Sequence, residues 1–209
     1  MNLHPRQGID ARHYVVDEVL RDGRKVRIRA IRPDDKERLL EHFGGLGTGS
    51  RYFRFFGLKR ALTSSDLVRF AELDFDRQAG LAATIEHNGR ERFIGVGHYI
   101  CTDLSSHAEI ALAVLDEYQG TGIGQRLIGH LARIAHANGI VQFEANVMGN
   151  NQRMLTLLRH SGCVIHHLNN AGVVHFTLHC PDHPDCQSSR LDPIHSDRQS
   201  GDPDGGSHG

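Results

Sequence analysis

The residues best suited to chemistry lie between Ala108 and Gly124. This stretch is an apolar run typical of a β-strand, it carries one carboxylate at Glu109, and it ends in the glycine-rich turn at residues 119–124, QGTGIG. A turn of this kind that opens onto a helix directs several backbone N–H groups toward one point, which favours a phosphate group there. The strand before it supplies a carboxylate that could accept a proton.

Two common phosphate-binding motifs fit this sequence poorly. A dinucleotide fingerprint needs a third glycine, which is missing whether one counts from Gly120 or from Gly122, although Glu144 stands about where a ribose-binding acid would follow. A Walker loop needs Gly-Lys-Ser/Thr, which the chain lacks. Residues 44–50 have the Walker glycine spacing but place Ser50 at the lysine position, so we predict a flexible loop there.

The turn resembles the pyrophosphate loop of the GNAT superfamily of N-acetyltransferases. The signature of that loop is Gln/Arg-x-x-Gly-x-Gly/Ala at the end of a strand, and Gln119, Gly122 and Gly124 fit it. The preceding strand of the superfamily carries an Ala-Glu-Ile type segment, which this chain has at residues 108–110. The resemblance implies that Glu109 is the general base; the alternative is an exposed glutamate on a half-buried strand.

The same resemblance implies acetyl-CoA as the co-substrate, with no metal. Backbone N–H groups of the turn would hold the pyrophosphate, and the end of the strand would pair with the pantetheine amides. Asn151 would bond near the cofactor or cap the following helix. The residues expected to bind the cofactor are Ala113, Val114, Leu115, Gln119, Gly120, Thr121, Gly122, Ile123, Gly124, Gln125 and Asn151.

Strand alternation places Glu109 on the same face as Ala111, Ala113 and Leu115. The two alanines beside the acid leave space for a thin pantetheine arm. Many members of the superfamily have a tyrosine acid where Leu158 stands here, so we predict no side-chain acid and assign protonation of the thiolate to a water.

A closer resemblance is carried by residues 20–23, 28–35 and 50–56, the last reading SRYFRFF. These segments resemble the catalytic domain of Pat-type bacterial protein lysine acetyltransferases over residues 18–180. This implies a protein lysine as acceptor, such as one on an acyl-CoA synthetase. Larger members carry a cyclic-nucleotide-binding or synthetase-like domain, which we do not expect here. The alternatives are a small-molecule amine acceptor and a non-catalytic module that binds acyl-CoA as a sensor.

Hydrophobic periodicity predicts an α/β fold of the mixed α+β type. We expect a GNAT-like, twisted, mostly antiparallel central sheet flanked by helices and followed by a disordered tail. The expected strands are residues 13–20, 25–31, 80–86, 92–101, 108–115, 140–147, 164–168 and 173–178. Helices are expected to begin near Pro33, after Thr63, after the glycine turn and at Gln152. Asp22-Gly23 predicts a hairpin within residues 13–31.

Composition limits the remaining possibilities. The chain has 209 residues, of which 39% are hydrophobic, with 24 Lys+Arg against 25 Asp+Glu. We therefore expect one domain over residues 1–180 and a polar, disordered tail over 181–209. Without a basic excess, a signal peptide or a long apolar run, we predict a cytoplasmic protein that binds neither nucleic acid nor membrane and keeps its four cysteines reduced.

Two further clusters suggest other functions. The cations of residues 51–60 alternate with aromatic residues, as in some single-strand nucleic-acid sites, but we interpret them as arginine stems over core aromatics. Cys180, His183 and Cys186 have a spacing that a metal could use. A structural zinc site needs four ligands in an ordered frame, so we expect no metal in the polar tail.

Overall fold

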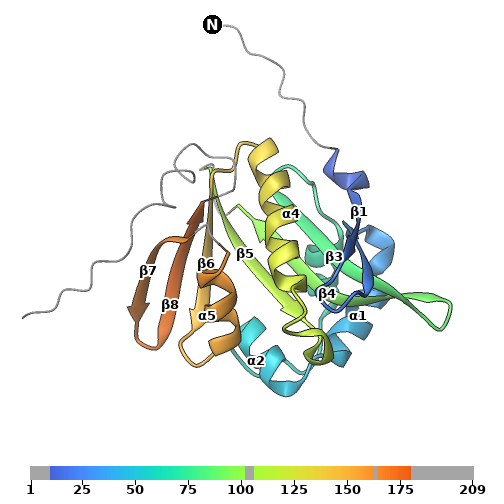
Figure 1. Ribbon diagram of the computed structural model, residues 1–209, viewed down its shortest axis with the longest axis horizontal. Helices are drawn as coiled ribbons and strands as arrows, with labels where there is room; N and C mark the ends of the chain where they lie inside the picture. The colour runs from blue at the N-terminus through green and yellow to red at the C-terminus, as the bar shows by residue number, and fades with distance from the viewer. Residues whose placement is uncertain (1–9, 102–105, 162–163, 180–209) are drawn as a thin grey trace, which may run out of the picture.

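The computed structural model describes residues 10–101, 106–161 and 164–179, and within them eight strands form one sheet (Figure 1). The strand order is β1-β2-β3-β4-β5-β6-β8-β7, and every neighbouring pair is antiparallel except β5 with β6. The strands are β1 Val15–Val19, β2 Lys25–Ala30, β3 Gln78–His87, β4 Arg90–Ile100, β5 His107–Val114, β6 Gln142–Met148, β7 Val164–Asn170 and β8 Val173–His179. The predicted mostly antiparallel sheet is confirmed, whereas the predicted tail at 181–209 lies outside the described residues.

Helices cover both faces of this sheet. The α-helices are α1 Lys36–Gly45, α2 Thr48–Phe55, α3 Ser64–Ala71, α4 Ile123–Ala137 and α5 Gln152–Arg159. Short 3-10 helices are η1 Ala11–His13, η2 Pro33–Asp35 and η3 Asp116–Tyr118. Figure 1 shows α4 and α5 lying across the same face of the sheet.

The core is divided by the sheet into two layers. On one face, Leu127 and Leu131 of α4 and Leu155 of α5 join the larger cluster of buried apolar side chains. On the other face, a smaller cluster contains Leu39 of α1 and Val96 of β4, with α3 packed beside them. Because successive strand residues point to opposite faces, each central strand contributes to both layers.

The loop predicted over residues 44–50 is wrong. Helix α1 continues to Gly45, and α2 begins at Thr48. Side-chain contacts override the weak helix propensity of the glycines: Arg51 donates to the nearby carbonyls of Leu46 and Gly44 at 2.8 and 2.7 Å, and Ser50 donates to the distant Asp116 carboxylate. At Gly47 a Cβ atom would lie 2.2 Å from a carboxylate oxygen of Asp116, so this position requires glycine for close approach rather than for flexibility.

A buried ion-pair network joins the N-terminal hairpin to the rest of the fold. Arg29 of β2 is 4% exposed and donates to both carboxylate oxygens of Asp35 at 2.7 and 2.8 Å. It also donates to both oxygens of Glu91 at 2.8 and 2.6 Å. Burial alone would raise the pKa of Asp35, but hydrogen bonds from Arg29 and from the Arg32 N–H outweigh it and lower that pKa. The network therefore ties β2, η2 and β4 together.

We predict that Asp35→Asn destabilises the protein by about 3 kcal/mol, because it removes the more deeply buried of the two carboxylates that pair with the Arg29 guanidinium. Asp17→Asn is the matched control: it breaks the exposed Arg27–Asp17 pair and should change the free energy of unfolding little. Because the pKa of Asp35 is lowered, its contribution is present above its ordinary value of 3.8 and is lost as the pH falls below it. Urea unfolding at pH 7 and pH 3 measures the free energy of unfolding of both variants. Equal losses of this free energy in Asp35→Asn and Asp17→Asn would contradict the prediction.

Candidate functional site

The glycine-rich turn has the backbone geometry that the sequence predicts. Gly120 and Gly122 have φ values of 80° and 95°, in the left-handed region that favours glycine, and Gly122 is the N-cap of α4. The first intrahelical bond runs from the Arg126 N–H to the Gly122 carbonyl, so the N–H groups of the first turn have no partner within the helix. No acidic residue lies in that turn, which leaves it open to an anion.

Arginines surround this helix N-terminus. A Cβ atom on Gly122 would lie 3.8 Å from Arg21 Nε and 2.8 Å from Arg126 Nη1. Arg153 of α5 donates to the side-chain oxygen of Gln119, which precedes the turn. Arg126 also pairs with the Glu18 carboxylate, at 3.1 Å from its Nε. Backbone N–H groups, the helix dipole and the nearby Arg21 guanidinium together make an electropositive site suited to a diphosphate.

The end of β5 has an unpaired edge. Strands β5 and β6 pair over three residues only, the last pair being Glu109 with Glu144. The Leu115 N–H donates to the Ile94 carbonyl on β4 at 2.9 Å, so by alternation the N–H groups of Leu112 and Val114 point toward the gap on the β6 side. An extended ligand with its own amides could pair with this edge as a strand would.

Three residues predicted to bind the pantetheine therefore differ in what they offer. Leu115 is buried, and its N–H is already bonded to β4. The Val114 carbonyl accepts from Gln119 Nε2 at 3.0 Å, whereas its N–H lies on the unpaired edge. The side chain of Ala113 lines a cavity on the opposite face of the sheet from α4.

The remaining predicted cofactor residues shape the turn or the helices beside it. Ile123 is buried in the core, and the hydroxyl of Thr121 donates to the Tyr118 carbonyl at 2.7 Å. Gly124 packs on α5, where a Cβ atom would lie 2.8 Å from Leu157 Cδ2. Asn151 is the N-cap of α5, since its side-chain oxygen accepts from the Met154 N–H at 3.2 Å.

Leu158, which stands where many members of the superfamily have a tyrosine acid, is fully buried in the larger core cluster. The side chain of Gln125, by contrast, is exposed and accepts from Arg21 Nη2 at 3.4 Å.

Glu109 lies where β5 and β6 begin to separate, and its side chain is exposed. Its register partner across the parallel pair, Glu144, is exposed as well and projects from the same face. His107 Nδ1 lies 3.8 Å from a Glu144 carboxylate oxygen. Sequence reasoning considered Glu144 only as a ribose-binding acid. Two neighbouring carboxylates attract a cation such as a protonated amine.

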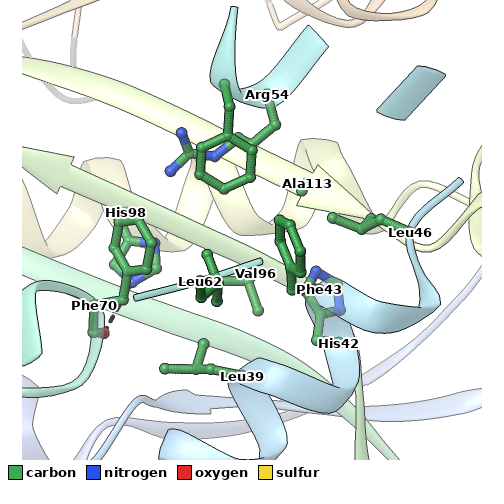
Figure 2. Close-up of a pocket in the computed structure, with 11 residues that line it drawn as sticks. Leu39, His42, Phe43, Leu46, Arg54, Leu62, Phe70, Val96, His98 and Ala113 are labelled. Atoms are coloured by element: carbon green, nitrogen blue, oxygen red, sulfur yellow. Dashed lines mark hydrogen bonds between the residues drawn. The ribbon is translucent and has the colours of Figure 1, made fainter. Parts of the chain in front are cut away.

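Beside this pair, α1, α2 and α3 enclose a cavity of about 30 Å³ over β4 and β5 (Figure 2). Its lining includes His42 and His98, which are only 5% and 4% exposed. Burial lowers the pKa of His42 to about 4 and that of His98 to about 3, so both imidazoles are neutral at pH 7. Each donates one ring N–H to a backbone carbonyl, and the second nitrogen has no partner among the described residues.

The two alternative clusters have different outcomes. In the segment 51–60, Arg51 stacks over Phe43 and Lys59 over Phe55, as predicted for cationic stems over aromatic rings. The prediction that these aromatic residues are core is wrong, because no residue of α2 is buried and Tyr52 and Phe56 are exposed. The Cys180–Cys186 spacing lies outside the described residues. Within the described ranges, no group of three or more potential ligands is arranged to hold a metal ion, and no helix is long and apolar enough to span a membrane.

Comparison with known proteins agrees with these features. The sequence profile described as Acetyltransferase (GNAT) family matches residues 51–162, more than half of the chain. A curated Pseudomonas aeruginosa protein named as an acetyltransferase is 30% identical over 149 residues, which cover 71% of this chain and 79% of the relative. The acetyltransferase Pat of Mycolicibacterium smegmatis is 29% identical over 152 residues. That alignment covers 69% of this chain and 43% of the relative, so the chain spans less than half of that protein.

Solved structures give the same result. The GNAT domain of S. lividans PAT has a TM-score of 0.72 and 34% sequence identity, with 79% of this chain and 96% of that chain covered. A Salmonella typhimurium acetyltransferase solved with its cofactor acetyl-CoA has a TM-score of 0.59 at 18% identity, covering 76% and 96%, and supports the fold alone.

We predict that Gly122→Ala lowers the thermal midpoint, because an alanine at φ 95° is strained by about 1–2 kcal/mol. Gly129→Ala in the same helix is the control: a Cβ atom there meets nothing within 4 Å, so it should be neutral or stabilising. Calorimetry of both variants tests this. Equal midpoints for the two variants would show that the turn tolerates another conformation.

Proposed function

This chain belongs to the GNAT family of acetyltransferases, and we propose that the amine it acetylates is the side chain of a protein lysine. The family assignment makes it an acyl-CoA-dependent N-acetyltransferase with acetyl-CoA as co-substrate. This favours the enzyme over the non-catalytic sensor considered from the sequence. The identity of the acceptor, the roles of the individual site residues and a cytoplasmic location of the protein are all parts of this proposal.

In the proposed mechanism Glu109 is the general base. A lysine ammonium has a pKa near 10.4, so presenting the neutral amine at pH 7 costs about 4.6 kcal/mol, which a positioned base helps to offset. The observation that carries this role is the exposed Glu109 carboxylate at the point where β5 and β6 separate. Glu144 beside it would help to attract the cationic acceptor.

The cofactor would lie along the unpaired edge of β5. Its diphosphate would occupy the N-terminus of α4, near Arg21 and Arg126, and its pantetheine amides would pair with the N–H groups of Leu112 and Val114. This arrangement brings the thioester toward the face that carries Glu109. Most of the acceleration would then come from positioning and from backbone donors directed at the thioester oxygen.

The chemical step is nucleophilic attack of the neutral amine nitrogen on the thioester carbon. Glu109 takes the proton released from nitrogen, the C–N bond forms, and the C–S bond breaks to release the thiolate of CoA. A thiol of this class has a pKa near 8.5, so the thiolate is a good leaving group, and water protonates it without a side-chain acid. This is consistent with Leu158 being buried in the core.

A protein lysine is favoured over a small amine by the shape of the acceptor face. Exposed polar side chains continue from Glu109 and Glu144 across β6 and β8 to Asn146 and His175. On this face α1 packs on β4 and α2 packs on β5. A long lysine side chain on a protein surface could reach the carboxylates from this side.

We predict that Glu109→Gln lowers kcat about 100-fold or more and leaves acetyl-CoA affinity nearly unchanged, because the amide cannot accept the proton. Glu86→Gln, an exposed glutamate at the β3–β4 hairpin, is the control and should retain full activity. CoA release with lysine-containing proteins and with small amines measures both variants. Equal turnover by Glu109→Gln and the parent would remove Glu109 from the mechanism, and turnover of small amines alone would refute the protein acceptor.

A further inference from the structure

Arg54 on α2 carries a guanidinium group that lies among aromatic rings. It lines the cavity over β4 and β5 and stacks on the rings of Phe55 and Phe70, at 5.1 and 5.8 Å from their centroids (Figure 2). Among the described residues, no carboxylate or carbonyl lies within ion-pair or hydrogen-bonding distance of it. The aromatic rings fix the position of the group and leave its N–H donors unused.

The surroundings do not neutralise this charge. The other titratable groups lining the cavity, His42 and His98, are neutral imidazoles at pH 7. Arg69 of α3 adds a second positive charge, and the nearest opposing influence is Glu109. Burial lowers the pKa of Arg54 to about 10, as expected for a desolvated cation without a counter-ion. A ligand with a negative charge would recover part of this desolvation cost.

The cavity lies on the face of the sheet that carries the reaction. Ala113, which lines it, is four residues from Glu109 on β5 and projects from the same face. His98 pairs in register with Ala111, midway between these two residues. Four strand residues span about 13 Å, so the wall of the Arg54 cavity at Ala113 lies within one acceptor molecule's length of Glu109.

We propose that Arg54 binds a carboxylate of the acceptor while the acceptor's amine lies at Glu109 and Glu144. The proposal deepens the proposed function, on which it rests. A planar guanidinium forms two parallel hydrogen bonds to a carboxylate, so the site would select acceptors that carry both an amine and an acid. Two sources have this chemistry: an acidic side chain beside the lysine of a protein, and the α-carboxylate of a free amino acid.

Another role for Arg54 would leave a different signature. If it only positioned Glu109 or held the thioester, its removal would lower kcat for every acceptor by the same factor. If it binds the acceptor carboxylate, its removal lowers kcat/KM only for acceptors that carry one. The comparison between matched acceptors therefore separates the two roles without depending on absolute activity.

The test uses the full chain and two sets of matched acceptors. The first set is lysine peptides with Glu or Gln at each position from two before to two after the lysine, and the second is L-lysine against cadaverine. We expect the parent enzyme to prefer the carboxylated member of at least one pair by about 10-fold or more in kcat/KM. Arg54→Gln should abolish that preference, Arg54→Lys should restore part of it, and Arg69→Gln, an exposed charge on α3, should leave it intact.

The outcomes distinguish this inference from the proposed function. Preference in the peptides supports a protein acceptor, and preference confined to L-lysine supports a free amino acid and refutes the protein acceptor. Acetylation without any carboxylate preference in the parent enzyme overturns the role of Arg54 alone, whether or not the variants fold. A preference that survives in folded Arg54→Gln overturns it as well. Failure to acetylate any acceptor overturns both.

Discussion

The site depends on the limited pairing of β5 with β6. Only three residue pairs join these parallel strands, and beyond Glu109 they separate. Buried backbone N–H and C=O groups are almost always paired in folded proteins, so an interior strand with an unpaired edge is suited to a ligand that completes it. Glu109 is exposed at the point where the two strands begin to separate. The helix that connects β5 to β6, α4, begins with its N-terminus at the unpaired edge of β5. The separation of β5 from β6 thus brings together three parts of the candidate site: the unpaired strand edge, the N-terminus of α4 and Glu109.

The two faces of the sheet have different roles. The α4 face is apolar and continuous, with Leu127 and Leu131 packed so closely on the central strands that Gly95 and Gly97 have little or no room for a side chain. The opposite face combines a smaller apolar cluster with neutral buried imidazoles, two exposed carboxylates and the Arg54 guanidinium, which has no ion-pair partner in the described part of the chain. Rigidity comes from the first face, and the polar groups that would meet an acceptor come from the second.

Local signals in the sequence predicted the elements well. The Asn-Gly pair at residues 88–89 forms a tight turn with φ values of 52° and 72°, which such a pair favours, and Thr63 caps α3 through a reciprocal bond with Asp66. Helix α2 was missed because its first turn contains Gly49 and is joined by Ser50 to Asp116, a residue far away in the sequence. The position of β8 between β6 and β7 was also not predicted, because periodicity does not define strand order.

The residues of the candidate site also fall into two groups: those that short local motifs reveal and those that only the tertiary structure brings together. Glu109 and the glycine turn could be found from short motifs because neighbouring residues define them. Glu144 joins Glu109 only through the register of a parallel pair, which depends on residues more than thirty positions apart. The unpaired state of Arg54 depends on where three helices place its neighbours, and an arginine among phenylalanines in sequence is equally consistent with a surface stem.

The Arg29–Asp35–Glu91 network has a consequence for the boundaries of the autonomous folding unit. Two of its three members precede residue 51, where the family profile begins. A recombinant fragment trimmed to the profile would lose β1, β2 and α1, turn β3 into a bare edge and leave Glu91 without its guanidinium. Exposed edges of this kind template aggregation. The segment that carries the recognisable family signature is therefore shorter than the segment needed to express it as a stable, monodisperse protein.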